Sequence, residues 1–542
     1  MRKKIAKKHK KKTGSVHKAF IQLAFVGAFT GVCAGVVITF FNILAHEGEA
    51  LSRDVYAYVR ANPAFIPLLF AVLSVGAFLI GVALQFSTVI RGCGIPQVEG
   101  AARGNVRFKW FRDTTLMFAT TLLSIFMGLS IGAEGPSVLI GAGVGDGVAN
   151  VTHRNEMIRR YQVAGGSCTG LAVASNAPLT GIVFAFEEAY KRFTPEVFVC
   201  SFSSVIAGML TRSVIYRLLG MEIRSAFHSY AFETLPLRNY LYVLLAGLIC
   251  GGMGLAFHKL CFKARALFKK IRAKKAGRQY FYRILIAVLF GGVCSLLTTG
   301  AMGGGYSLID ALGTRGGAQS SQVETVLAQA GKSVAWALLF VLLLKFSVTV
   351  VNVGSGLPCG IFIPIIAIGA CIGGLLNELW QVLGMNRAYC DLMMMICMAA
   401  FFAALVRAPL TAIIMICEMT GSFAPLLPVV IGVAIGYTVG EISRTDGIYE
   451  ELLEAYEHEN GIHENAVREV YTIGIALGAI ADKREVRDVL WPAGARVKEI
   501  HRGEEIILPD GDTVLHGGDV LTIVCKTDDP EKTKDDLTHI LG

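Results

Sequence analysis

Three carboxylates stand in apolar sequence, where a charge is costly. Glu134 lies in the run Gly132–Pro136, and Glu187 and Glu188 follow one another in a second apolar run. An ionisable side chain in such surroundings indicates a function unless a partner explains it. A carboxylate beside an anion site can fill that site when ionised and leave it when protonated, which couples an anion to a proton. The plainer alternative is a glutamate that caps a helix.

Glycine and proline interrupt three apolar segments where a continuous helix would not tolerate them. These segments are Gly92–Pro96, Gly132–Pro136 and Gly354–Pro364. Glycine lets backbone N–H groups approach a ligand, and proline suits the first turn of a helix, so each segment can end as a helix N-terminus with free donors. Such termini attract anions, and broken backbone inside a membrane must line a cavity. The competing interpretation is a set of kinks that serve helix packing.

An internal repeat can be read directly from the chain. Two motifs occur twice, at offsets of 231 and 228 residues: Ala177–Thr180 with Ala408–Thr411, and Gly132–Pro136 with Gly360–Pro364. Two independent motifs at nearly one offset predict two related halves. In membrane proteins such halves commonly surround a central site built from interrupted helices.

The repeat separates the two adjacent glutamates. Glu187 has a counterpart in Glu418, whereas Glu188 aligns with Met419. A feature present in both halves is expected to be architectural. The unmatched Glu188 is therefore the candidate for function.

The composition is that of a membrane protein. Of 542 residues, 54% are hydrophobic and 17% charged, and apolar stretches long enough to span a bilayer recur between residues 19 and 442. Basic stretches at the N-terminus and at Lys259–Arg283 predict that both face the cytosol. The net charge of +10 follows from these stretches and requires no nucleic acid. The thirteen cysteines show no metal-ligand or disulfide spacing and are expected to be buried thiols in a reducing setting.

The sequence predicts four consecutive parts. They are a basic cytosolic tail at 1–18, a membrane domain at 19–455, a linker at 456–465, and a small cytosolic α+β domain at 466–542. The last part alternates short apolar strands with polar turns and closes on a helical tail. No ATP-binding, zinc-protease or nucleophile-elbow motif is present, so the chain is not expected to be an enzyme and needs no cofactor or metal.

The membrane part resembles the CLC family of chloride channels and proton-coupled chloride antiporters over residues 20 to 455. The motifs that carry the resemblance are, in order, Gly92–Pro96, Gly132–Pro136, Gly360–Pro364 and Gly447–Tyr449. The resemblance implies an all-α, polytopic fold with two inverted halves and broken helices. It also implies a homodimer in the cell membrane of a bacterium, in which each subunit has its own pathway.

The same resemblance assigns the site residues. Chloride is expected at the backbone amides of Ile361 and Phe362, the Tyr449 hydroxyl and the segment Cys93–Gly94. Glu134 is expected to be the external gate. Glu188 is expected to transfer protons on the internal side.

Two residues depart from the family pattern. Cys93 replaces the usual serine, and a thiol is a weaker donor than a hydroxyl; Ala133 replaces a basic residue before the gating glutamate. A fluoride-selective branch of the family lacks the tyrosine, so Tyr449 favours chloride.

In the C-terminal part, the order of the motifs Leu490–Pro492, Val497–Arg502, Ile507–Pro509 and Leu515–Asp519 resembles the TrkA-C subdomain found in regulators of potassium conductance. Its expected ligand is a small regulator such as cyclic di-AMP, with His501 and Arg502 meeting phosphates while Ile500 and Ile507 cover a base. The alternative for this strip is a dimerisation strand with solvated charges.

The function predicted from these residues is chloride/proton antiport across the cell membrane. The simultaneous presence of Glu134 and Glu188 favours an antiporter over a passive, voltage- or proton-gated chloride channel. A third alternative is a ligand-sensing complex in which transport is secondary to the C-terminal domain.

Overall fold

The computed structural model describes most of the chain. The described residues are 2–154, 156–191, 193–222, 225–271, 277–313, 334–461, 467–492, 494–503, 505–527 and 530–542. For residues 2–19, 156, 467, 526 and 532 only the backbone is described. Residues 462–466 of the expected linker lie outside the described residues.

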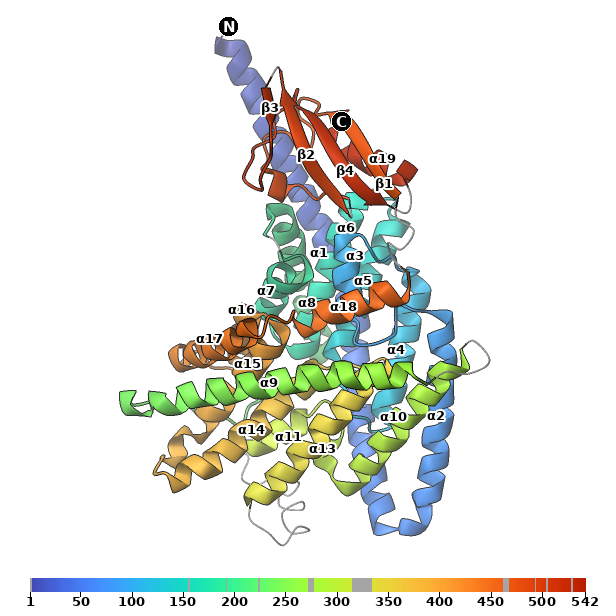
Figure 1. The fold of residues 1–542 in the computed structure, drawn as a ribbon, viewed down its shortest axis with the longest axis vertical. Helices are drawn as coiled ribbons and strands as arrows, with labels where there is room; N and C mark the ends of the chain where they lie inside the picture. The colour runs from blue at the N-terminus through green and yellow to red at the C-terminus, as the bar shows by residue number, and fades with distance from the viewer. Residues whose placement is uncertain are drawn as a thin grey trace.

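Helices build the whole membrane domain (Figure 1). The first half consists of α1 Arg2–Ala61, α2 Ile66–Phe86, α3 Ile95–Arg103, α4 Trp110–Phe126, α5 Glu134–Val151, α6 Glu156–Ser175, α7 Pro178–Phe184, the π turn η2 Ala185–Ala189 and α8 Pro195–Leu218. The second half consists of α9 Tyr240–Lys269, α10 Arg278–Leu297, α11 Tyr306–Leu312, α13 Val334–Ser355, α14 Phe362–Val382, α15 Cys390–Val406, α16 Pro409–Thr420 and α17 Leu426–Ile442. Helix α18, Ile448–Glu459, follows and continues beyond the boundary expected at 455. Short 3-10 turns at Pro63–Phe65, Leu237–Asn239, Thr299–Ala301 and Arg387–Tyr389 join some of these helices.

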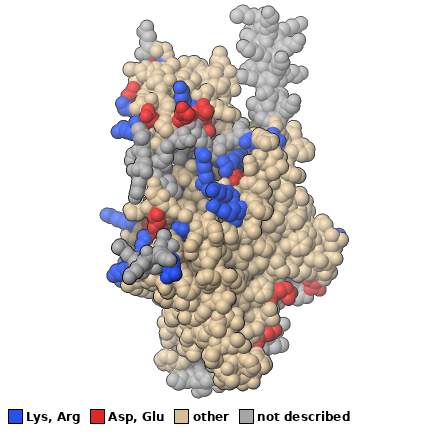
Figure 2. Space-filling model, turned by 90° about the vertical axis from the view of Figure 1, so that its right-hand side faces the viewer, with Lys and Arg blue, Asp and Glu red and all other residues tan. Residues whose placement is uncertain are grey.

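Eight helices of the described part are long and apolar enough to cross a membrane. Large hydrophobic side chains such as Phe25, Val75 and Leu210 are exposed on them, as is expected of surfaces that face lipid. Figure 2 shows a broad face nearly free of charge, with most Lys and Arg gathered in its upper part. The chain is therefore a multi-pass membrane protein.

The two halves pack in the same order. In the first, α5 contacts α6, α6 contacts α8, and α8 contacts α1. In the second, α14 contacts α15, α15 contacts α17, and α17 contacts α9. The predicted fold of two related halves with broken helices is confirmed.

Glu187 and Glu418 join the halves by a reciprocal exchange. The Glu187 carboxylate accepts the backbone N–H groups of Leu410 and Thr411 at 2.8 and 2.5 Å, at the start of α16. The Glu418 carboxylate accepts those of Leu179 and Thr180, both at 2.8 Å, at the start of α7. Each carboxylate thus accepts hydrogen bonds from N–H groups that have no partner within their own helix. Its negative charge also interacts favourably with the positive end of that helix, which belongs to the opposite half. The architectural role predicted for this pair is confirmed.

The exchange predicts a large effect on stability. Glu418→Ala removes an ionised acceptor from two backbone donors and from the Thr180 hydroxyl, 2.7 Å away. We expect it to cost about 3 kcal/mol, the scale of lost hydrogen bonds to a charged group, and to lower the thermal midpoint of the purified protein by several degrees. Glu441→Ala is the control, because Glu441 is half-exposed and reaches Arg407 only at 3.6 Å. Equal midpoints for the two variants would contradict the assignment.

The C-terminal domain is a four-stranded antiparallel sheet with one helix. Its elements are β1 Val467–Gly474, β2 Ala495–Arg502, β3 Glu505–Ile507, β4 Val520–Thr527 and α19 Pro530–Leu541, in the strand order β1-β4-β2-β3. Buried residues of β2, β4 and α19 form its own apolar core. The domain contacts the membrane part through an ion pair between Arg484 and Glu196. In Figure 1 it lies at the same end of the molecule as the start of α1.

Candidate anion and proton site

Three helix N-termini meet at the centre of the membrane domain. Helices α3, α5 and α14 each begin within one of the interrupted segments that the sequence singled out. Gly132 and Gly360, which correspond in the repeat, exchange two backbone hydrogen bonds of 2.8 and 3.2 Å. The Cys359 N–H donates to the Gly92 carbonyl at 3.2 Å, which joins the first segment to the third.

Glycine is required where α3 and α5 approach each other. Gly94 has a φ of +90°, and a Cβ there would stand 2.7 Å from the Gly135 carbonyl oxygen. A Cβ on Gly135 would stand 2.4 Å from the Cys93 carbonyl oxygen. Side chains at either position would force the two helix termini apart.

The groups at this junction can hold an anion without a full positive charge. Ile361 and Phe362 are buried at the start of α14, where the first N–H groups of a helix have no acceptor within it. Cys93 is buried at the turn that leads into Gly94 and α3. The buried Tyr449 hydroxyl finds no hydrogen-bond partner among the described residues. A dehydrated anion accepts from N–H, S–H and O–H groups of this kind.

The structure brings the predicted residues into one electrostatic neighbourhood. The Tyr449 hydroxyl lies within electrostatic range of the Cys93 thiol and of the Glu134 and Glu188 side chains. These groups come from positions separated by more than 350 residues at the extremes. Two buried carboxylates therefore lie near the groups that could bind an anion.

Glu134 lies at the first position of α5 and is 1% exposed. Its Oε1 atom accepts a 2.5 Å hydrogen bond from the Tyr306 hydroxyl, while Oε2 has no partner in the described part of the chain. The unpartnered Oε2 leaves an atom to which a proton can bind.

A buried lysine that was not predicted lies beside the segment that leads into Tyr306. Lys345 on α13 is fully buried and donates to the carbonyls of Met302 and Gly303 at 3.1 and 2.6 Å. A Cβ on Gly305, the residue before Tyr306, would lie 3.6 Å from its Nζ atom. Lys345 thus places a positive charge beside the Tyr306 segment, while the expected basic residue is replaced by Ala133.

Glu188 lies in the π turn η2, a local geometry that recurs at functional sites. The turn directs the side chains of adjacent residues to different partners. Glu187 reaches the N-terminus of α16, whereas Glu188 is buried at 3% exposure. The charges that act on Glu188 include Glu99, Lys191 and Glu450.

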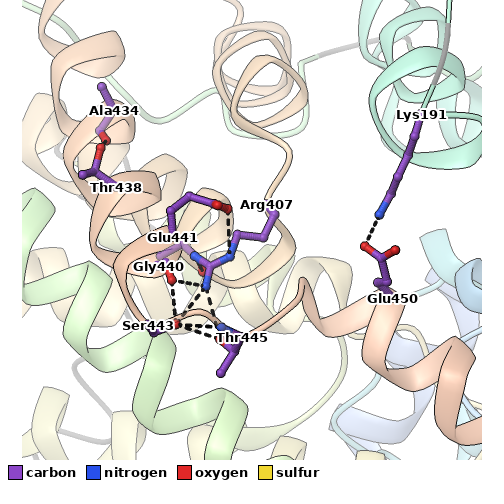
Figure 3. A network of polar contacts seen from close by, with 10 residues as sticks. Lys191, Arg407, Ala434, Thr438, Gly440, Glu441, Ser443, Thr445 and Glu450 are labelled. Carbon is purple, nitrogen blue, oxygen red and sulfur yellow. Dashed lines mark hydrogen bonds and ion pairs between the residues drawn. The ribbon is translucent and has the colours of Figure 1, made fainter. Parts of the chain in front are cut away.

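A cluster of ion pairs lies close to Glu188 and includes Lys191, whose side chain is 36% exposed. Lys191 approaches Glu450 at 2.5 Å and Glu99 at 3.4 Å, and Figure 3 shows the first of these contacts. Arg103 binds the same two carboxylates at 3.3 and 2.5 Å. Because Glu450 follows Tyr449 on α18, these ion pairs connect the surroundings of Glu188 with the helix that carries Tyr449.

Arg407 fixes the turn from which α18 emerges. Its guanidinium donates to the carbonyls of Ala404 and Gly440 at 2.6 and 2.5 Å and to the hydroxyls of Ser443 and Thr445, both at 3.4 Å (Figure 3). These bonds join the ends of α15 and α17 just ahead of α18. They position the first turn of α18, where Tyr449 lies.

The strip expected to bind a regulatory ligand is the β2–β3 hairpin. Ile500 is fully buried in the core of the domain and pairs with Ile507 on β3. Arg502 donates to both carboxylate oxygens of Asp519 at 2.9 and 2.8 Å. Although burial opposes ionisation, this bond from Arg502 holds the pKa of Asp519 below its ordinary value. The side chains of His501 and Arg502 are 42% and 35% exposed.

Family models match both parts of the chain, and a curated relative matches its membrane part. A family model described as "Voltage gated chloride channel" matches residues 75–441, and the TrkA-C domain matches residues 470–537. The chain is 31% identical over 390 residues to the H(+)/Cl(-) exchange transporter ClcA of Yersinia pestis bv. Antiqua (strain Angola), covering 70% of this chain and 75% of that protein.

Two solved structures share the fold. A slow cyanobacterial Cl−/H+ antiporter is 23% identical with a TM-score of 0.70, and the match covers 81% of this chain and 99% of that one. A CLC-type fluoride/proton antiporter is 21% identical with a TM-score of 0.62, and the match covers 79% of this chain and 97% of that one. Both likenesses concern the architecture.

Proposed function

Because this chain belongs to the voltage gated chloride channel family, we propose that it is a chloride/proton antiporter. The observation that carries the proposal is the burial of two carboxylates: Glu134 at the start of α5, where Gly135 packs against the Cys93 carbonyl, and Glu188 in the π turn η2. The ClcA proteins to which the chain is similar are named as proton/chloride exchangers. An enzymatic activity forms no part of the proposal.

The proposed mechanism alternates an anion with a carboxylate. Chloride binds at the N-termini of α3 and α14, beside Cys93, Gly94, Ile361 and Phe362, with the Tyr449 hydroxyl as a further donor. The ionised Glu134 side chain competes for the same positive environment and withdraws when it is protonated. Each withdrawal therefore admits chloride and carries one proton.

Glu188 supplies the second stage of the proton route. Its burial separates it from water, and Lys191 and Glu450 connect its surroundings to the surface. Protons that reach Glu188 exchange with Glu134 through the region of Tyr449. Chloride takes a route that does not require Glu188.

We further propose a homodimer in a bacterial cell membrane with both termini in the cytosol. The family supports the dimer. The basic N-terminal stretch supports the orientation, as does the position of the C-terminal domain at the same end of the molecule as the start of α1 (Figure 1).

The test is a flux measurement on liposomes that contain the purified chain and an imposed chloride gradient. Outside pH and outside chloride are recorded together. Proton movement against its own gradient, driven by chloride, is the expected result. Chloride flux without proton movement would contradict antiport and indicate a passive channel.

Cys93 makes a prediction about affinity. Cys93→Ser replaces a weak thiol donor by a shorter and stronger hydroxyl donor, so chloride is expected to bind about two- to fivefold more tightly, the scale of one modest hydrogen bond. Titration calorimetry in detergent measures the dissociation constant. Cys294→Ser, at a buried cysteine in a separate apolar cluster, is the control. An unchanged dissociation constant in Cys93→Ser would show that the side chain does not face the ion.

The C-terminal domain leads to a regulatory proposal. We infer that it binds cyclic di-AMP at the β2–β3 hairpin, which the TrkA-C match and the exposed His501 support. Titration of the full chain with cyclic di-AMP is expected to release heat, which His501→Ala abolishes and Lys498→Gln, at a 62% exposed side chain, retains. If His501→Ala still binds cyclic di-AMP, the ligand binds at another place. If the wild type does not bind it, the proposal is wrong.

A further inference from the structure

A cavity reaches from the anion site to the end of α18. Cys93 and Ile361 line its inner part, and Glu459, the last residue of α18, lines its outer part. Its volume is about 50 Å³. Because one water needs roughly 10–15 Å³ measured in this way, the cavity can hold a few waters or one small ion.

Four basic side chains and one carboxylate line this cavity. The bases are Arg91, Arg265, Lys269 and Arg283, and the carboxylate is Glu459. Arg265 donates from Nε and Nη2 to the Glu459 Oε1 atom at 3.2 and 3.0 Å, and Lys269 Nζ lies 3.0 Å from the same atom. Arg265 and Lys269 therefore already bind a carboxylate of the chain itself, that of Glu459.

The other two bases have no such partner. Arg91 donates to the Leu84 carbonyl at 2.9 and 3.2 Å, and Arg283 donates to the carbonyls of Lys269 and Ile271 at 3.3 and 3.5 Å. Within the described residues neither forms an ion pair with a carboxylate, and the buried Nε of Arg283 has no acceptor.

An aromatic ring holds these two guanidinium groups together. Their Cζ atoms lie 4.2 and 5.8 Å from the centre of the Tyr280 ring. The contact with the ring fixes the positions of both guanidinium groups before a ligand binds.

We propose that this cavity is a binding site for a phosphate group, held by Arg91 and Arg283, and that its occupant obstructs the path between the anion site and the end of α18. Planar guanidinium forks match the paired oxygens of an oxyanion, whereas chloride offers a single spherical acceptor. The surplus of positive charge favours a divalent anion over a monovalent one. The obstruction, unlike the binding, rests on the proposed transport of chloride.

Binding is measured without transport. Inorganic phosphate is titrated into the purified full chain in detergent, and the broadening of the phosphorus NMR line reports the bound fraction. We expect Arg91→Gln/Arg283→Gln to weaken binding at least tenfold, and Arg278→Gln, at an exposed base on the same helix as Arg283, to leave it unchanged. Arg91→Lys keeps the charge but loses the fork, so it provides a milder variant with an intermediate affinity. No broadening in the wild type, or equal broadening in the double variant, would overturn the site.

Obstruction is measured by chloride efflux from liposomes with phosphate on both faces. Phosphate is expected to slow efflux in the wild type and in Arg278→Gln but not in the double variant. A parallel series with ATP identifies the source: slowing at lower concentration than phosphate assigns the group to a nucleotide, and slowing by phosphate alone assigns it to the free ion. If the double variant lowers chloride flux and phosphate has no effect, the cluster gathers chloride and the proposal is wrong. Failure of antiport appears separately, as efflux without proton movement while phosphate still binds.

Discussion

Glu134→Gln is expected to abolish chloride-driven proton movement while chloride transport continues. The amide keeps the shape of the side chain and can still meet the Tyr306 hydroxyl, 2.5 Å from Oε1 in the native protein. It can neither take up nor release a proton, so the proton step disappears. Proton flux should fall by about a hundredfold or more, the scale on which a positioned proton-transfer group acts.

The pH dependence of chloride flux provides a second measurement of the same variant. In the native protein, acid protonates Glu134 and frees the anion site, so chloride flux should rise as the pH falls. In Glu134→Gln the flux should not change with pH. Tyr306→Phe is the control: it removes a donor to Glu134 but leaves the carboxylate, and coupling should persist. A Glu134→Gln variant that still moves protons would exclude Glu134 as the gate.

Local sequence predicted the parts of the site that depend on backbone chemistry. Glycine and proline placed the N-termini of α3, α5 and α14 correctly, because these residue types fix a helix start wherever it lies in the fold. The repeat also predicted correctly that Glu187 has a structural role. Glu187 and Glu418 correspond in the repeat, and each accepts hydrogen bonds from a helix N-terminus of the opposite half. Both inferences needed only neighbouring residues or an internal offset.

Contacts between distant segments could not be predicted in this way. Tyr306 meets Glu134 across 172 positions, and Lys191 meets Glu450 across 259 positions. Neither Tyr306 nor Lys191 stands in a motif that distinguishes it from an ordinary surface or packing residue. Lys345 carried one usable signal, a lone base inside the apolar run of α13, which indicates function inside a membrane. In the C-terminal domain, alternation along β2 indicated a half-buried strand but not the pairing of Arg502 with Asp519.

Although Glu187 and Glu188 are adjacent, their replacement by glutamine is expected to have different effects. Glu188→Gln should lose proton flux, and Glu187→Gln should lose stability. Glu188→Gln should reduce proton flux to that of empty liposomes, because the buried carboxylate is the proposed proton carrier beside Lys191 and Glu450. Its chloride flux should persist, and its thermal midpoint should not fall, since an amide satisfies the same buried position without the cost of a charge.

Glu187→Gln should instead retain coupling and lose stability. The amide accepts one backbone N–H at the start of α16 where the carboxylate accepts two, from Leu410 and Thr411. The lost charge also removes the favourable interaction with the helix terminus, so a cost of about 2 kcal/mol is expected. Parallel records of proton flux, chloride flux and thermal midpoint test both variants under one set of conditions. Loss of coupling in Glu187→Gln with normal coupling in Glu188→Gln would reverse the assignment of the pair. Loss of coupling in both variants would mean that the π turn acts as one unit, because its geometry would then matter more than the identity of either carboxylate.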